Sequence, residues 1–375
     1  MSLHELTDDQ REIRELTRRF ADEKIAPFAA RWDRDHHFPR ELFAELGELG
    51  LMGVCVPEEH GGAGADFLAY VLVLEELSRA DAGVGVTVAV HTSAGTLPIL
   101  NHGSAEQIEA HVPRLASGEE LSAFALTESG SGSDAGAMRT RISEDGRISG
   151  AKQWITNGSF ASTFIVFAKE GDKPSAFLVR AGADGFGVTR EEEKMGLNSS
   201  STADLAFEDT PAERLGEPGN GMRVALRTLD GGRIGIAAQA VGIAQAALDL
   251  ATGYAKERNA FGGPIARFQA IQRKLADMQT EVEAARALVW RAARLKEHGK
   301  PHSVEGAQAK LFASGVARRQ TGEAIQILGG YGYTKEFPAE RYYRDAKVTE
   351  IYEGTSEIQK LVIARALLGE AMRGQ

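Results

Sequence analysis

Apolar residues recur with the period of an α-helix through the first third of the chain. Two capping-box patterns, Thr7 with Gln10 and Ser104 with Gln107, mark helix starts within residues 7–118. Pro39 stands where the first turn of another helix would begin. The pattern predicts an N-terminal all-α domain over residues 1–120.

The pattern changes near residue 121. Short runs rich in β-branched and aromatic residues, at 163–167, 175–179 and 203–207, are separated by Gly, Asp and Asn. Such runs are typical of strands in a small sheet. They predict a middle β-barrel or β-sandwich domain over residues 121–221.

The helical period returns from Met222 onward and persists. Apolar positions then step by three and four over more than five turns, at Phe268, Ile271, Leu275, Met278, Val282, Ala285 and Val289. Long antiparallel helices of this kind pack as a bundle, which we predict over residues 222–375. The fold class is therefore α+β and multidomain.

Composition narrows the functions that such a fold can carry. The 375 residues exceed the size of one hydrophobic core, and the net charge of −10 disfavours nonspecific binding to nucleic acid or to anionic membranes. The single cysteine, Cys55, excludes an internal disulfide, and no metal-binding motif occurs among the nine histidines. The first 14 residues lack the features of a secretory signal, and no apolar run approaches a membrane span. We expect a cytoplasmic protein whose redox chemistry, if any, uses a bound cofactor.

Two segments of the middle region suggest a nucleotide or a planar ring, although each also has a simpler interpretation. Residues 130–135 match G-x-G-x-x-A, but residues 138–143 are predicted as a strand where a dinucleotide fingerprint needs a helix. An ordinary turn is the alternative. Residues 154–157, Trp-Ile-Thr-Asn, place an aromatic ring beside a hydroxyl, which suits a flavin face or a strand end in the core.

Polar residues near glycines mark two places in the C-terminal region. Asp230 and Arg233 flank two glycines at the predicted start of the long helix, where a carboxylate commonly does no more than stabilise the helix dipole. Ser356 and Gln359 match a capping box, so Glu353 falls on the loop that enters a helix. Taken alone, Glu353 could be a surface acid at a helix N-terminus.

Six segments, taken together and in this order, resemble the acyl-CoA dehydrogenase family over essentially the whole chain. They are residues 124–134, 154–157, 230–233, 258–262, 326–332 and 351–357. The resemblance implies an N-terminal helical domain, a middle β-domain and a C-terminal four-helix bundle, usually assembled as a homotetramer. It also implies FAD held between subunits, and an electron-transfer flavoprotein as the electron acceptor.

The resemblance assigns roles to individual residues. It implies that FAD contacts the loop residues Phe124, Leu126, Thr127 and Ser133 and the wall formed by Trp154, Ile155 and Thr156. It implies that the FAD phosphates and adenosine, partly across a subunit boundary, contact Arg258, Gln269, Gln326, Leu328, Gly329 and Gly330, and that the remaining FAD contacts include Phe261, Thr355 and Glu357. It implies that the acyl-CoA contacts Ser133, Asp230, Arg233, Tyr352 and Gly354. Glu353 matches the catalytic base.

Departures from other branches of the family indicate the substrate. In isovaleryl- and long-chain-type enzymes the base occupies a position that aligns with Gly231 of this chain. In glutaryl-type enzymes an arginine occupies the position that aligns with Gly85. The first difference leaves Glu353 as the base, and the second disfavours a dicarboxylic acyl group. The segment 229–278 resembles the butyryl-type branch, so we expect a short-chain, possibly branched, acyl-CoA, as used in fatty acid β-oxidation.

The expected reaction is α,β-dehydrogenation. Glu353 takes the α-proton while the β-carbon gives hydride to flavin N5, yielding a trans-2-enoyl-CoA, and the site must stabilise charge on the thioester oxygen. Two alternatives remain open: a flavin oxidase, monooxygenase or nitroalkane oxidase of the same fold that uses O₂, and a non-catalytic helical binding protein.

Overall fold

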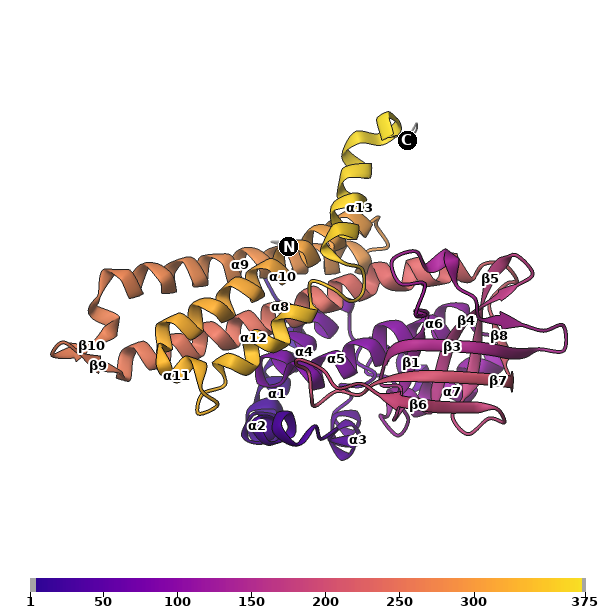
Figure 1. Ribbon diagram of the computed structural model, residues 1–375, viewed down its shortest axis with the longest axis horizontal. Helices are drawn as coiled ribbons and strands as arrows, with labels where there is room; N and C mark the ends of the chain where they lie inside the picture. The colour runs from indigo at the N-terminus through magenta and orange to yellow at the C-terminus, as the bar shows by residue number, and fades with distance from the viewer. Residues whose placement is uncertain (1–4, 373–375) are drawn as a thin grey trace.

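The structure is a computed structural model that describes residues 5–372, so the predicted outer bounds at residues 1 and 375 and the first four residues of the N-terminal segment lie outside it. Helices of the N-terminal region lie between a β-sheet and a group of long helices (Figure 1). This is the predicted three-part arrangement. The division at residues 120 and 221 stays a prediction.

The N-terminal region is helical, as predicted. Its α-helices are α1 (Asp8–Phe20), α2 (Ala26–Asp35), α3 (Arg40–Glu48), α4 (Phe67–Ala80), α5 (Ala82–Ala89), α6 (Leu97–His102) and α7 (Ala105–Ala116). Two π-helical segments, Ala21–Ile25 and Val90–Thr96, continue α1 and α5, and a 3₁₀ turn spans Glu58–His60. Both capping boxes are confirmed, because the Thr7 and Ser104 side chains accept from the backbone N–H of Gln10 and Gln107.

Within the described residues the middle region forms one eight-stranded sheet, ordered β6-β7-β3-β2-β4-β5-β8, with β1 paired in parallel to β4. Its strands are β1 (Ser122–Ala125), β2 (Arg141–Ile142), β3 (Arg147–Thr156), β4 (Thr163–Glu170), β5 (Lys173–Arg180), β6 (Phe186–Glu191), β7 (Thr202–Pro211) and β8 (Glu213–Leu215). The three predicted runs are β4, β5 and β7. The strand predicted at residues 138–143 is only the two-residue β2, and a 3₁₀ turn, Ala135–Ala137, precedes it.

The sheet has a core on each face because side chains alternate along its strands. On β4, Ile165 and Phe167 belong to the core shared with α7 and α8, whereas Phe164 and Val166 belong to the core on the other face. All four side chains are fully buried.

Long helices make up the C-terminal region. They are α8 (Gly221–Glu257), α9 (Gln269–Glu297), α10 (Ser303–Leu328), α11 (Gly330–Tyr333), α12 (Ala339–Val348) and α13 (Ser356–Leu368). A small hairpin of β9 (Asn259–Ala260) and β10 (Gly263–Pro264) and a 3₁₀ turn, Ile265–Arg267, connect α8 to α9, and a last 3₁₀ turn spans Gly369–Met372. Helices α8, α9 and α10 pack side by side, α12 lies against α10 and α8, and α13 projects from the body (Figure 1).

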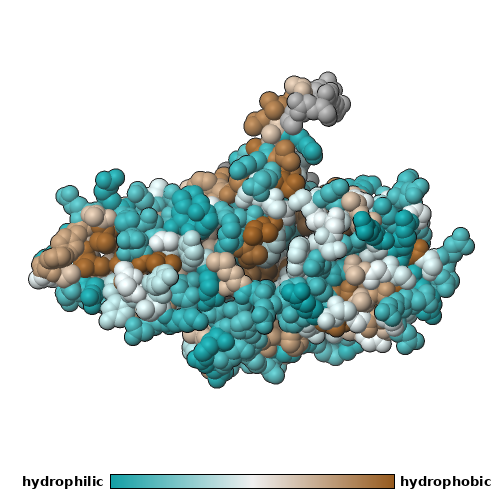
Figure 2. Space-filling model, viewed as in Figure 1, coloured by the Kyte–Doolittle hydropathy of each residue, from teal (hydrophilic) through white to brown (hydrophobic). Residues whose placement is uncertain are grey.

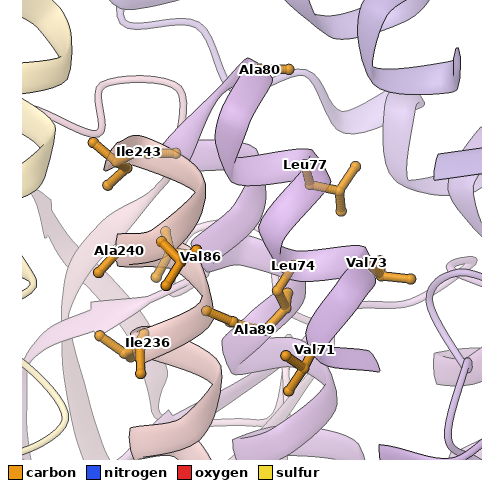
Figure 3. Packing of buried hydrophobic residues seen from close by; sticks show 14 of the residues in the cluster. Val71, Val73, Leu74, Leu77, Ala80, Val86, Ala89, Ile236, Ala240 and Ile243 are labelled. Carbon is orange, nitrogen blue, oxygen red and sulfur yellow. The ribbon is translucent and has the colours of Figure 1, made fainter. Parts of the chain in front are cut away.

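The main core lies where α4, α5 and α8 meet. Figure 3 shows Leu74 and Leu77 of α4, Val86 of α5 and Ile236 of α8 in this packing, and all four are buried. Contrary to the sequence expectation, two stretches, Ala82–His102 and Gly221–Glu257, are long and apolar enough to cross a membrane. Their most apolar windows are 89% and 83% buried within the fold, as in core helices.

Candidate active site

Two buried polar atoms without hydrogen-bond partners mark one place among the described residues: Oε2 of Glu353 and Nε of Arg233. Glu353 lies in the loop between α12 and α13, and Arg233 lies in α8. A Cβ atom built on Gly232 would lie 2.6 Å from Glu353 Oε2, so the carboxylate rests against bare helix backbone. Eleven such atoms occur among the described residues, and these two belong to side chains whose charges interact. A carboxylate and a guanidinium that interact and each keep a buried polar atom without a partner suit a place that receives a ligand.

Burial dominates the electrostatics of Glu353. Loss of hydration raises the pKa of its carboxyl, and the positive charges of Lys310 and Arg233 oppose that rise. The interpretation of Glu353 as a surface acid is therefore wrong for its carboxylate, although part of the residue remains accessible to solvent.

The loop that carries Glu353 has an unusual backbone. Glu353 has φ of +53° and Gly354 has φ of +92°, so two successive residues are left-handed. Helix α13 then starts with Thr355 as its N-cap, whose side chain accepts from the N–H of Ile358 at 3.3 Å. The predicted cap, Ser356, is thus one residue too late, because its backbone is already helical.

Side chains from three helices hold this loop. The hydroxyl of Tyr352 donates to Gln239 of α8, whose amide donates to the carbonyl of Ala82 at 2.8 Å. The carbonyl of Gly354 accepts from Lys310 Nζ and from Gln359 Nε2, each at 2.7 Å. Sequence reasoning missed Gln239 and Lys310, and it named Gln359 only as the partner of Ser356 in a capping box. A lysine among small residues within a helix, at position 310, was the available signal.

Asp230 and Arg233 form an ion pair of 2.6 Å, and Ser303 donates to the same Asp230 oxygen at 2.9 Å. The prediction that they stand at the start of the helix is wrong, because α8 begins nine residues earlier, at Gly221. The helix dipole therefore does not explain Asp230. Asp230 lies instead on the wall of a cleft of about 420 Å³ that is also lined by basic groups, at His102, Arg227, Lys296 and His302.

The predicted flavin wall lies on β1, β3 and the loop after β1. Trp154 has φ of +58° and is 57% exposed, whereas Ile155 is buried. Thr127 accepts from the N–H of Gln153 at 2.9 Å, which joins the loop to β3. The other predicted members are half-buried or buried, at Phe124, Leu126 and Thr156, or exposed, at Ser133.

The remaining predicted cofactor contacts fall in two further places. Glu357 is exposed on α13, two residues after the cap residue Thr355. At the opposite end of the molecule from the sheet (Figure 1), a cleft of about 590 Å³ is lined by Arg258, Leu328, Gly329 and Gly330, with the Arg258 guanidinium 5.6 Å from the Tyr331 ring centre. Phe261, Gln269 and Gln326 lie exposed in the same region.

One chain therefore does not bring the two groups of cofactor candidates together. Trp154 is exposed on β3, in the sheet region, whereas Phe261, 90% exposed, lies in the turn between β9 and β10, at the end of the molecule away from the sheet (Figure 1). An exposed aromatic wall and an exposed arginine cleft suit the ring and phosphate parts of a large planar nucleotide cofactor. Their separation suits a cofactor that contacts two copies of the chain.

Comparison with known proteins identifies the family. Family models for the N-terminal, middle and C-terminal domains of acyl-CoA dehydrogenases match residues 7–119, 123–210 and 219–368. The chain belongs to the acyl-CoA dehydrogenase family. It is an oxidoreductase with the three-part fold of that family, and its cofactor is FAD, which the residues described above fit.

Individual relatives of this acyl-CoA dehydrogenase cover nearly its whole length. The mitochondrial short-chain specific acyl-CoA dehydrogenase of Mus musculus is 51% identical, over 97% of this chain and 91% of its own. Butyryl-CoA dehydrogenase from Megasphaera elsdenii is 44% identical with a TM-score of 0.94, over 97% of this chain and 99% of its own.

Two further solved structures bear on cofactor and partner. An acyl-CoA dehydrogenase from Bacillus anthracis complexed with FAD is 38% identical with a TM-score of 0.93, over 99% of this chain and 68% of its own. A chain solved in work on the electron transferring flavoprotein of Acidaminococcus fermentans is 46% identical with a TM-score of 0.96, over 98% of this chain and 99% of its own.

Proposed function

We propose that this acyl-CoA dehydrogenase oxidises a short-chain acyl-CoA to the trans-2-enoyl-CoA, with Glu353 as the base that removes the α-proton. The observation that carries the proposal is the buried Oε2 of Glu353, which has no hydrogen-bond partner among the described residues and rests against Gly232. A carboxylate that has lost its water and has no donor is a stronger base than one in solution.

The residues around Glu353 suit proton removal. Lys310 and Arg233 favour the ionised carboxylate, so burial does not leave the base permanently protonated. The backbone N–H of Glu353 donates no hydrogen bond within the described residues, so it is free to receive the developing charge on a thioester oxygen. When FAD is bound, the flavin supplies the electron acceptor for the reaction.

The cleft beside Asp230 suits the CoA part of the substrate. Arg227 and Lys296 present cationic groups to it, which would attract the CoA phosphates, while Asp230 and Arg233 are placed to meet its polar linker. This placement extends the predicted substrate contacts at Asp230 and Arg233. Ser133, Tyr352 and Gly354 remain predicted substrate contacts.

Two observations support a short acyl group without a second carboxylate. The similar proteins from Mus musculus and Megasphaera elsdenii act on short-chain and butyryl thioesters, by their names. At Gly85 a Cβ would lie 2.0 Å from Ser78 Oγ, so an arginine for a distal carboxylate has no room there.

Electron transfer to an electron-transfer flavoprotein, a homotetramer and a cytoplasmic location complete the proposal. The similar chain from Acidaminococcus fermentans supports the partner. The same-fold oxidase or monooxygenase remains the second candidate, and reoxidation of the reduced flavin by air or by the flavoprotein, in stopped flow, distinguishes them. Family membership removes the non-catalytic alternative.

The variant Glu353→Gln tests the base. It keeps the shape of the side chain and removes the proton acceptor, so FAD content should stay normal while flavin reduction by butyryl-CoA slows by about 10²- to 10⁴-fold. Anaerobic stopped-flow bleaching at matched FAD content measures this. Because the pKa of Glu353 is raised, the wild-type rate should fall as pH drops through that pKa, where the carboxylate takes up its proton.

Glu357→Gln is the matched control. Glu357 lies four residues further along, is exposed and belongs to the predicted FAD contacts, so at matched FAD content its charge should matter little to bleaching. A Glu353→Gln enzyme that bleaches within tenfold of wild type, alongside an inactive Glu357→Gln enzyme, would show that the wrong carboxylate was chosen.

A further inference from the structure

Lys310 is a buried cation without a carboxylate partner within 4 Å among the described residues. It lies in the third turn of α10, and the residue is 1% exposed. Its ammonium donates to two backbone carbonyls, those of Thr349 at 3.0 Å and Gly354 at 2.7 Å. Burial of a lysine is costly, and a surface loop could be tied down by neutral donors. The positive charge of Lys310 therefore needs an explanation other than anchoring the loop backbone.

Both carbonyls belong to the segment that carries Glu353. Thr349 lies four residues before the carboxylate and Gly354 directly after it. Ser314 of α10 donates to the same Thr349 carbonyl at 3.0 Å, so one face of α10 holds the segment on the near side. The left-handed backbone at Glu353 and Gly354 is costly and persists only when its surroundings fix it.

The charge of Lys310 also acts on Glu353. The charged and titratable groups around Lys310 are Arg233 of α8 and Glu350 and Glu353 of the loop, with Glu353 the largest electrostatic influence on Lys310. Conversely, Lys310 is the largest favourable influence on the ionised form of Glu353. Burial lowers the pKa of Lys310 to about 8, and the ammonium is still mostly protonated at neutral pH.

We propose that Lys310 is a positioning residue for the reaction: it fixes the peptide that follows Glu353 and places one positive charge behind the base. It contacts the loop backbone and acts through Glu353, without contact to the substrate. This inference rests on the proposed role of Glu353.

Gln359 provides a matched control because it donates to the same Gly354 carbonyl at the same distance, 2.7 Å, without a charge. Removal of either donor loosens the peptide, but only removal of Lys310 takes away the charge. The pH profile of flavin reduction therefore separates the two effects.

The experiment compares Lys310→Met and Gln359→Met with wild type in anaerobic stopped flow with butyryl-CoA between pH 6 and pH 9. We expect Lys310→Met to keep FAD and KM but to bleach more slowly at the acid end of this range, because loss of the positive charge raises the pKa of Glu353 further and lowers its ionised fraction there. Its profile should move to higher pH, so that much of the rate returns at pH 9. Gln359→Met should keep the wild-type profile.

Lys310→Gln is a second variant, which keeps a donor but no charge, and it should show the same shift. A wild-type profile in both lysine variants, or an equal shift in Gln359→Met, would overturn the inference. Loss of FAD from both lysine variants would also overturn it, because Lys310 would then serve the fold as a whole. Glu353→Gln in the same assay distinguishes failure of this inference from failure of the proposed function. If Glu353→Gln bleaches normally, the proposed base is wrong. If Glu353→Gln is inactive, a wild-type pH profile in the lysine variants overturns only the role of Lys310.

Discussion

At the scale of single residues, the space for the base is made by an absent side chain. A Cβ at Gly232 would lie 2.6 Å from Glu353 Oε2, whereas one at Gly231 would lie 3.0 Å from Lys296 Nζ. The two neighbouring glycines of α8 thus face different groups. In the branches that carry the base on this helix, its carboxylate would reach the place of the Glu353 carboxylate from position 232 and not from position 231. The sequence alignment with Gly231 is therefore wrong by one residue.

Gly232→Ala should lower activity without lowering stability. Alanine is favoured over glycine inside a helix by about 1 kcal/mol, and the end of the Glu353 side chain can swing away from a new methyl group. The base then leaves its position, so butyryl-CoA should bleach the flavin at least about tenfold more slowly, the cost that general-base misplacement implies.

The comparison for this test is Gly231→Ala at saturating butyryl-CoA, because its methyl group meets the flexible end of Lys296 in the proposed CoA cleft and leaves the base untouched. Thermal unfolding and bleaching rates of both variants are the measurements. Equal bleaching rates in the two variants would contradict the assignment of Gly232 to the site.

Sequence patterns located Glu353 but not its environment. The residues 351–357 resemble a family motif that can be recognised in one dimension, whereas Lys310 and Gln239 reach the loop from helices that are distant in sequence. No spacing rule relates a residue in the third turn of α10 to a loop 43 positions away, so tertiary packing alone shows these contacts.

At the scale of elements, a buried ion pair joins the loop after β1 to β3. Lys152 of β3 donates to Glu128 at 2.8 Å and to the carbonyl of Leu126 at 3.0 Å, and its side chain is 0% exposed. Glu128 also accepts from the backbone N–H groups of Arg139 and Thr140. Lys152 and the backbone of residues 139 and 140 thereby hold in place the loop that is predicted to contact the flavin.

Lys152→Met should destabilise the protein by about 3 kcal/mol, because it leaves a buried carboxylate without its cation. It should also weaken FAD retention, since the Leu126 carbonyl loses its donor. Urea unfolding and the flavin-to-protein absorbance ratio after dialysis measure the two effects. The double variant with Glu128→Gln should lose less stability than the two single variants added together, and strict additivity would argue against the pair.

Most elements followed from sequence periodicity, and the exceptions have local causes. The start of α8 was placed at Asp230 because its first turns, from Gly221, carry no cap signal, and Asn220 makes no side-chain cap bond. The strand expected at 138–143 is short because Glu128 accepts the N–H groups of Arg139 and Thr140, which are then not available to a neighbouring strand.

At the scale of the whole molecule, α13 stands away from the body and carries exposed leucines (Figure 2). Leu361, Leu367 and Leu368 are 43%, 79% and 55% exposed. Apolar surface of this kind on a projecting helix is typical of a contact between subunits. Together with the two separated cofactor regions, it supports the proposed homo-oligomer, a state that one chain's sequence shows only by resemblance.

The double variant Leu367→Asp/Leu368→Asp should therefore shift the protein toward smaller species and reduce its FAD content, because two charges would be buried at the contact. Sedimentation velocity with detection at the flavin absorbance follows both. Arg365→Asp, an exposed change on the same helix, is the comparison and should leave the oligomer intact. A wild-type protein that sediments as a monomer with full FAD would refute the idea that copies share the cofactor.

Helix α8 contributes side chains to two hydrophobic cores, which couples their unfolding. It is 37 residues long, about 55 Å at the usual helical rise, and its first turns supply Val224 and Ala225 to the core beneath the sheet. Later turns supply Ile236 and Val241 to the core between α4 and α10. Loss of either core removes packing from the same continuous helix. We therefore expect these two cores to unfold together, which calorimetry would record as a single transition.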